Sequence, residues 1–131
     1  MTSQAELARQ GVEAYNRGDL EALVERADPG ITMVPVRALL EGGEYRGHEG
    51  IRRFLADMEE DWERREIVVD EIRELDDGVL VLGTFKAVGR SGNEVSQPVA
   101  WHTRYRDGKL LRLVAYTDQA AAARELGLAG G

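Results

Sequence analysis

The sequence predicts an α+β fold, with N-terminal helices packed on one face of a curved, mainly antiparallel sheet. In the first half of the chain, apolar residues recur at helical spacing, and the clearest series is Ile51, Phe54, Leu55, Met58 and Trp62. From residue 66 onward the apolar period changes to two, and Asp-Gly and Gly-Asn sequences divide the segment into strands. A meander of this kind leaves one sheet face for the helices to cover.

Capping residues mark the helix boundaries. Ser3 and Glu6 form a capping box, in which each side chain satisfies a free backbone amide of the first helical turn. Gly18 can end this helix in a left-handed conformation, and Asp19 is placed to cap a second helix. A third helix is expected to begin near Gly47.

Period-two patterns and turn residues define the strands. The segment 36–44 is expected to be a loop, because Pro35 ends the first strand and two glycines follow. An alanine-rich helical turn is expected over 119–126. The expected strands are 31–34, 66–75, 79–89, 95–106 and 109–117.

The last hairpin allows two registers. A two-residue Asp107-Gly108 turn would pair Tyr105 with Leu110, whereas a three-residue loop with a glycine bulge would pair Tyr105 with Lys109. We favour the bulged loop because it gathers the apolar residues of the hairpin on one face of the sheet more completely. It directs four residues toward the helices, namely Trp101, Thr103, Leu113 and Ala115. It leaves a second group on the opposite face, namely His102, Arg104, Arg112 and Tyr116.

Composition excludes several classes of function. The 131 residues fit one domain over residues 1–131, and the formal net charge of −7 argues against nucleic-acid binding. The basic pairs Arg52-Arg53 and Arg64-Arg65 are mixed with acidic residues, which is typical of a solvated helix face. The chain has no cysteine, no secretory signal and no apolar segment long enough to span a membrane. We therefore expect a cytoplasmic protein that does not bind membranes.

Local strings in the chain resemble the nuclear transport factor 2-like superfamily and, within it, the polyketide cyclase (SnoaL-like) group. The strings are the segments 14–23 and 45–51, Asp107-Gly108-Lys109-Leu110, and Tyr116-Thr117-Asp118. The resemblance covers nearly the whole chain. It implies a cone-shaped barrel with an internal cavity, and a homodimer built through the sheet.

The same resemblance allows a check for known catalytic residues. Ketosteroid isomerases of this superfamily carry a general-base Asp, an oxyanion Tyr and a protonated acid at positions that match Val34, Gly11 and Trp101 here. Limonene epoxide hydrolases use an Asp at the position that matches Ala115. The chemistry of these enzymes is therefore not expected in this chain.

Three other residues are candidates for acid or base roles. Asp118 could act as an acid, although we favour a role as the N-cap of the terminal helix. His102 could be a general base, but the favoured register directs it away from the helices. Tyr15 lies on the apolar stripe of the first helix and could act as an acid or as part of a pocket wall. No metal site is predicted, because His48 and the other histidine lie on different elements.

The leading hypothesis is a small-molecule-binding domain with an apolar internal pocket, without metal or organic cofactor, that works as a homodimer. One alternative is a cofactor-independent cyclase, isomerase or hydratase. The other is an interaction module that uses the outer sheet face. The expected pocket lining, which could equally be plain core packing, is Tyr15, Met33, Trp62, Trp101, Thr103, Leu113 and Ala115.

Overall fold

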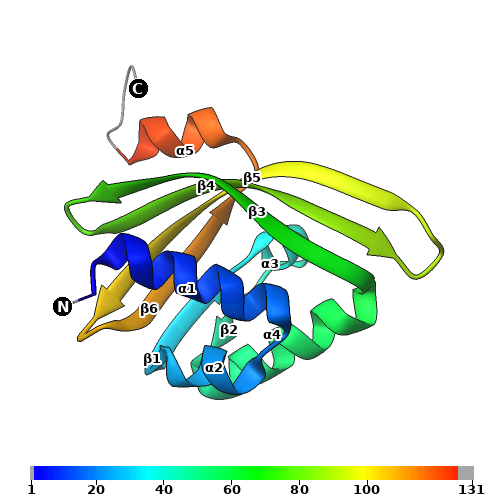
Figure 1. Ribbon diagram of the computed structural model, residues 1–131, viewed down its shortest axis with the longest axis horizontal. Coiled ribbons are helices and arrows are strands. Elements are labelled where there is room, and N and C mark those ends of the chain that lie inside the picture. The colour runs from blue at the N-terminus through cyan, green and yellow to red at the C-terminus, as the bar shows by residue number, and fades with distance from the viewer. Residues whose placement is uncertain (1, 127–131) are drawn as a thin grey trace.

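The computed structural model describes residues 2–126, and it confirms the α+β fold class (Figure 1). Helices α1, α2 and α4 lie on one side of a six-stranded sheet, and α5 lies on the other side. The helices are α1 Gln4–Arg17, α2 Leu20–Glu25, α3 Val36–Glu41, α4 Gly47–Asp61 and α5 Gln119–Glu125. The strands are β1 Ala27–Val34, β2 Tyr45–Arg46, β3 Trp62–Leu75, β4 Gly78–Gly89, β5 Glu94–Arg106 and β6 Lys109–Tyr116.

The predicted N-caps of the first two helices are confirmed, whereas the return bond of the capping box, from the Ser3 amide to Glu6, is not found among the described residues. Ser3 Oγ accepts a hydrogen bond of 3.1 Å from the backbone amide of Glu6, at the start of α1. Gly18 ends that helix with φ 67°, a left-handed conformation that glycine adopts without strain. Asp19 then accepts a hydrogen bond of 3.1 Å from Ala22 and caps α2.

The sheet has the strand order β2-β1-β6-β5-β4-β3. Strands β3 to β6 form an antiparallel meander, whereas β1 runs parallel to β6. Among the described residues the sheet stays open, with β2 and β3 as its edges. The helices on the inner face complete the cone-shaped enclosure that an open sheet alone does not provide.

The turn of the last hairpin differs from the favoured prediction. Asp107 and Gly108 have φ of 52° and 77°, the two positive values that a two-residue type I′ turn requires. Tyr105 therefore pairs with Leu110, and the favoured three-residue loop is wrong.

A bulge two residues further along β6 restores the predicted faces. The register shifts there, so that Arg104 pairs with Arg112 and Leu111 has no partner on β5. Beyond the bulge, Thr103 pairs with Leu113 and Trp101 pairs with Ala115. The prediction that these four residues share the inner face therefore holds, although it was reached through the wrong turn.

Other boundaries also differ from the sequence prediction: β1 begins at Ala27 instead of residue 31, and β2 was not predicted. The expected loop 36–44 contains helix α3, which begins after Pro35 and ends at Gly42, whose φ is 83°. Trp62 was expected in the third helix, but it has extended backbone angles and begins β3. Its apolar side chain continues the helical stripe on the inner side even though its backbone belongs to the sheet.

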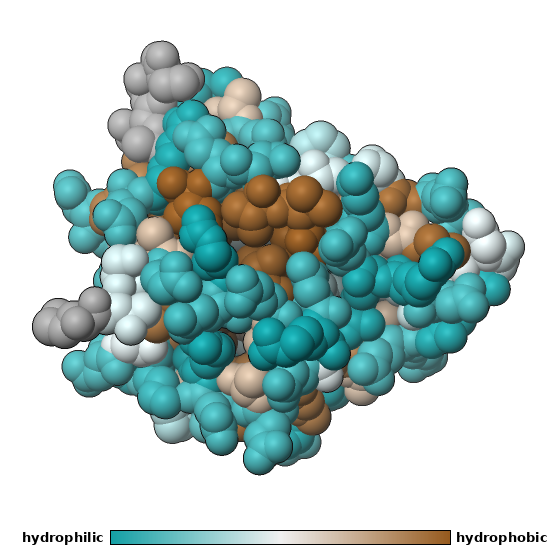
Figure 2. Space-filling view, viewed as in Figure 1, coloured by the Kyte–Doolittle hydropathy of each residue, from teal (hydrophilic) through white to brown (hydrophobic). Residues whose placement is uncertain are grey.

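The outer face of the sheet is partly covered by α5. Ala122 of this helix packs with Leu80 and Ala100, and all three side chains are fully buried. The side of the molecule seen in Figure 2 is mainly hydrophilic, with a group of hydrophobic side chains near the middle of the view. The predicted outer-face residues therefore share their side of the sheet with a helix.

Candidate functional site

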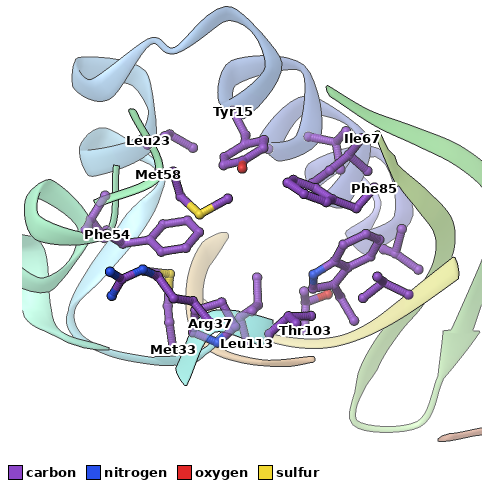
Figure 3. A pocket seen from close by; sticks show the side chains of 18 of the residues that line it. Tyr15, Leu23, Met33, Arg37, Phe54, Met58, Ile67, Phe85, Thr103 and Leu113 are labelled. Carbon is purple, nitrogen blue, oxygen red and sulfur yellow. The ribbon is translucent and has the colours of Figure 1, made fainter. Parts of the chain in front are cut away.

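A cavity of about 490 Å³ lies between the helices and the inner face of the sheet (Figure 3). Its walls come from helices α1, α2, α3 and α4 and from strands β1, β3, β4, β5 and β6. Most of the wall is apolar, and six aromatic side chains contribute to it: Tyr15, Phe54, Trp62, Phe85, Trp101 and Tyr105. Such a wall suits a ligand that is mainly apolar.

The aromatic rings form two contacts on opposite parts of the wall. Tyr15 stacks on Phe54 with a centroid separation of 6.0 Å, and this pair joins α1 to α4. Trp62 meets Phe85 edge to face at 5.6 Å and joins the start of β3 to β4. These contacts hold the rings in place and leave the space between them open.

Most of the predicted lining residues surround this cavity. They are Tyr15, Met33, Trp62, Trp101, Thr103 and Leu113. Ala115 does not line the cavity: its side chain is only 1% exposed and lies on β6 beside Trp101 of β5. Strand alternation gave the face of Ala115 correctly, but its short side chain is buried in the packing and does not reach the cavity.

Sequence reasoning missed several cavity residues. Phe54 was recognised only as part of a helical stripe, and Phe85 lay in a strand that is apolar on both faces, so its direction was undetermined. Leu110 lines the cavity, although the favoured register placed it on the outer face. The two-residue turn pairs Leu110 with Tyr105 and so turns it inward, and the bulge that follows returns Leu113 to the same face.

Tyr15 brings a polar group to the apolar wall. Its side chain is 7% exposed, and its phenol ring borders the cavity in Figure 3. Burial raises the pKa of Tyr15 to about 12, against the opposing effect of the nearby Arg65 charge. The phenol is therefore neutral at ordinary pH and has one proton to donate.

A charged cluster marks the opening of the cavity. The most exposed lining residues are Leu40, Glu41 and Asp61, at the ends of α3 and α4. Arg37 of α3 donates hydrogen bonds of 2.9 Å to Glu41 and 2.8 Å to Asp61. The cavity thus has an apolar interior and an ionic edge, and its arginine is already engaged by carboxylates.

A second hydrogen bond extends this cluster behind α3. The hydroxyl of Tyr45 donates to Asp57 across 2.6 Å, and Arg37 lies 3.4 Å from the same carboxylate. Burial, together with the hydrogen bond to Asp57, raises the pKa of Tyr45. Three carboxylates therefore surround one guanidinium, which leaves this edge of the cavity net negative.

The other two acid-base candidates lie away from the cavity. His102 is on the outer face, where its Nε2 lies 3.3 Å from Asp77 Oδ1. Asp118 accepts a hydrogen bond of 3.0 Å from the amide of Ala121 and caps α5. The structure therefore does not bring either residue together with Tyr15.

The positions that match ketosteroid isomerase catalytic residues carry no acid in this cavity. Gly11 and Trp101 line it, whereas Val34 packs beside a core cluster. Within residues 2–126, no three His, Cys, Asp or Glu side chains are gathered as a metal ion would require. No helix in that range is both long and apolar enough to cross a membrane.

Comparison with known families assigns the chain. The SnoaL-like domain family matches residues 8–113. The chain belongs to the SnoaL-like family. This result confirms the family that the local sequence strings indicated.

Solved structures of other proteins share the fold of this SnoaL-like domain. A protein of unknown function from Burkholderia pseudomallei, described as nuclear transport factor 2-like, has a TM-score of 0.79 at 21% identity, with 96% of this chain and 98% of that chain covered. TerC, co-crystallised with polyporic acid, has a TM-score of 0.78 at 26% identity, with 95% and 98% covered. A SnoaL-like polyketide cyclase, assigned by similarity, from a Jannaschia species has a TM-score of 0.73 at 20% identity, with 94% and 90% covered. A search of the curated proteins found no match.

Proposed function

We propose that this SnoaL-like domain binds a flat, largely apolar small molecule in the cavity between its helices and its sheet. The observation that carries the proposal is the cavity of about 490 Å³ lined by six aromatic side chains. Ligand pockets in proteins commonly measure about 300–1,000 Å³ and combine apolar walls with a few polar groups. The cavity has this size and this composition.

Plain core packing is a poor explanation of this wall. Well-packed interiors leave few voids larger than a water molecule, because each void forfeits dispersion contacts. Here Gly11 of α1 faces the cavity, and a Cβ atom added to it would meet no other atom within 4 Å. A glycine in mid-helix destabilises the helix by about 0.5–1 kcal/mol relative to alanine, so the space that it leaves open favours a ligand.

The relative TerC supports a small-molecule ligand. It is 26% identical over 95% of this chain and was co-crystallised with polyporic acid. The identity of the ligand of this chain does not follow from that relative. The aromatic wall, however, favours molecules with ring systems, because rings can stack on it.

An enzyme of the cyclase, isomerase or hydratase type is the second candidate. The observation that favours it is the presence of Glu41 and Asp61 at the cavity opening, where a carboxylate could take a proton from a bound molecule. Both carboxylates accept hydrogen bonds from Arg37, so each is already engaged within the protein. We therefore place binding before catalysis.

A fluorescent apolar probe tests the binding function. N-phenyl-1-naphthylamine becomes bright when it enters an apolar site, and the chain should bind it saturably with one molecule per protomer. Gly11→Phe fills the open space and should abolish the signal, whereas Gly11→Ala adds one methyl group and should retain it. Absence of binding to the wild-type chain, or undiminished binding to Gly11→Phe, would overturn the proposal.

A further inference from the structure

Among the described residues the Tyr15 hydroxyl donates no hydrogen bond within the protein, whereas two other polar groups of the cavity wall are already engaged. Thr103 Oγ1 donates to the carbonyl of Val79 at 3.3 Å, and the Arg37 guanidinium donates to carboxylates. Arg65, the polar neighbour of Tyr15, has only donor groups and cannot accept the phenol proton. The Tyr15 hydroxyl therefore faces the cavity with a proton for which a ligand oxygen can compete.

Arg65 places a buried positive charge behind that phenol. Its guanidinium carbon lies 5.1 Å from the centroid of the Tyr15 ring, and its side chain is 11% exposed. This burial corrects the solvated-face interpretation for Arg65 alone, since Arg52, Arg53 and Arg64 are exposed.

The charge of Arg65 is weakly compensated. Glu59 reaches it only at 4.0 Å, and within the described residues its Nε has no hydrogen-bond partner. A cation beside the ring withdraws electron density from the phenol and makes its hydroxyl a stronger donor. Tyr15 and Arg65 together therefore favour an oxygen that carries partial or full negative charge.

We propose that the ligand carries a carbonyl, enolate or phenolate oxygen that accepts a hydrogen bond from the Tyr15 hydroxyl, with Arg65 as the positioning residue that strengthens this bond. The inference rests on the proposed function and narrows the ligand class from apolar ring systems to ring systems with an oxygen acceptor. The acidic opening agrees with this arrangement, because Glu41 and Asp61 would repel an anionic group left there. The ligand oxygen instead binds at the part of the wall formed by Tyr15, where Arg65 supplies the positive charge.

A pair of nearly isosteric probes tests the inference. Fluorene and 9-fluorenone differ by a carbonyl, and each can compete with N-phenyl-1-naphthylamine for the cavity. Tyr15→Phe should weaken fluorenone binding roughly 3- to 10-fold, the effect of one net hydrogen bond, and leave fluorene binding unchanged. An equal effect on both probes, or on neither, would overturn the role of Tyr15.

The possible results distinguish a failure of this inference from a failure of the proposed binding function. If the wild-type chain binds neither the dye nor fluorene, the proposed function fails. If it binds both and the preference for fluorenone survives in Tyr15→Phe, binding stands and the inference fails. Thermal unfolding of the variant confirms that it is folded under the conditions of the assay.

Variants of Arg65 test its indirect role. Arg65→Gln removes the charge and should reduce the ratio of fluorenone affinity to fluorene affinity about 2- to 5-fold, less than the loss of the hydrogen bond itself. Arg65→Lys keeps the charge and should restore most of the ratio. A purely structural role would change the affinities for both probes together, and that result would remove Arg65 from the proposal.

Discussion

The guanidinium of Arg37 on α3 donates a hydrogen bond of 2.8 Å to Asp61, the last residue of α4. This bond crosses the opening of the cavity and ties a six-residue helix to a longer one. Helix α3 also carries Leu40, whose side chain is 81% exposed, so few apolar contacts hold its outer side. The ion pair therefore attaches this edge together with Ala38, the buried residue of α3.

Arg37→Met should loosen α3 without unfolding the protein. The paired side chains are partly exposed, so solvent screening limits the cost in unfolding free energy to about 1 kcal/mol. Hydrogen exchange should accelerate over 36–41 and remain unchanged in the central strands. Arg46→Met is the matched control, because its ion pair with Glu44 lies outside the cavity wall. Unchanged hydrogen exchange over 36–41 would contradict the role of the Arg37 ion pair in holding α3.

Stability should fall at alkaline pH because of Tyr15. Its pKa is about 12 in the folded chain and about 10 in the unfolded chain, so between these values the folded state holds a proton that the unfolded state loses. This contribution is complete below pH 10 and is lost as pH rises to 12, at a cost of about 2–3 kcal/mol. Urea titrations at pH 9 and pH 11.5 measure it.

Tyr15→Phe is the control for that pH dependence. The variant should lose less stability between the two pH values than the wild-type chain does. A residual decline is expected, because burial also raises the pKa values of Tyr45, Tyr105 and Tyr116. Identical declines in both proteins would mean that the Tyr15 phenol is not buried as described.

Gly83 should not tolerate a side chain. A Cβ atom at this position would lie 2.6 Å from the carbonyl oxygen of Val68 and 3.4 Å from the Trp101 ring. Gly83→Ala should therefore destabilise the protein by about 1–3 kcal/mol, since a backbone atom must move. Gly11→Ala makes the same chemical change in open space and should stabilise by about 0.5–1 kcal/mol. If the two variants shifted the denaturant midpoint by the same amount and in the same direction, the close pairing of β3 with β4 would be contradicted.

Asp118→Ala should affect stability and leave the binding site intact. The carboxylate caps α5 through the amide of Ala121, and loss of such a cap costs about 0.5–2 kcal/mol. Affinity for N-phenyl-1-naphthylamine should stay at the wild-type value, because Asp118 does not line the cavity. A large loss of affinity in a folded variant would show that the terminal helix contributes to the site.

A homodimer through the outer sheet face remains a prediction. Helix α5 covers Leu80 and Ala100 there, so a partner would have to use the part of the face around Arg104, Arg112 and Val114. Light scattering after size exclusion should give twice the chain mass of 14.5 kDa. A monomer at micromolar concentration would contradict it.

Sequence reasoning succeeded where a few neighbouring residues decide the structure. The caps by Ser3, Asp19 and Asp118 depend on side chains within three residues of the amides they bind, so the local sequence contains the whole signal. The inner positions of Trp101 and Thr103 followed from strand alternation. The resemblance to the family predicted the cone-shaped enclosure with a cavity, which strand alternation alone does not specify.

The remaining features depend on contacts between distant segments. The bulge at Leu111 arises from how β6 meets β5, and it allows Leu110 and Leu113 to face the cavity together. Arg65 looked like one more charge in a charged segment, and only the position of α1 shows that it lies against Tyr15. Pairings of this kind cannot be read from spacing, because they require the tertiary arrangement first.

The parallel pairing of β1 with β6 has a consequence for folding. Thr32 and Arg112 are 80 residues apart in the sequence and adjacent in the sheet. Because contacts between such distant residues carry a high loop-closure entropy, they form late and slow the overall rate. We therefore expect the cavity to be completed late in folding, when the C-terminal strand β6 pairs with β1.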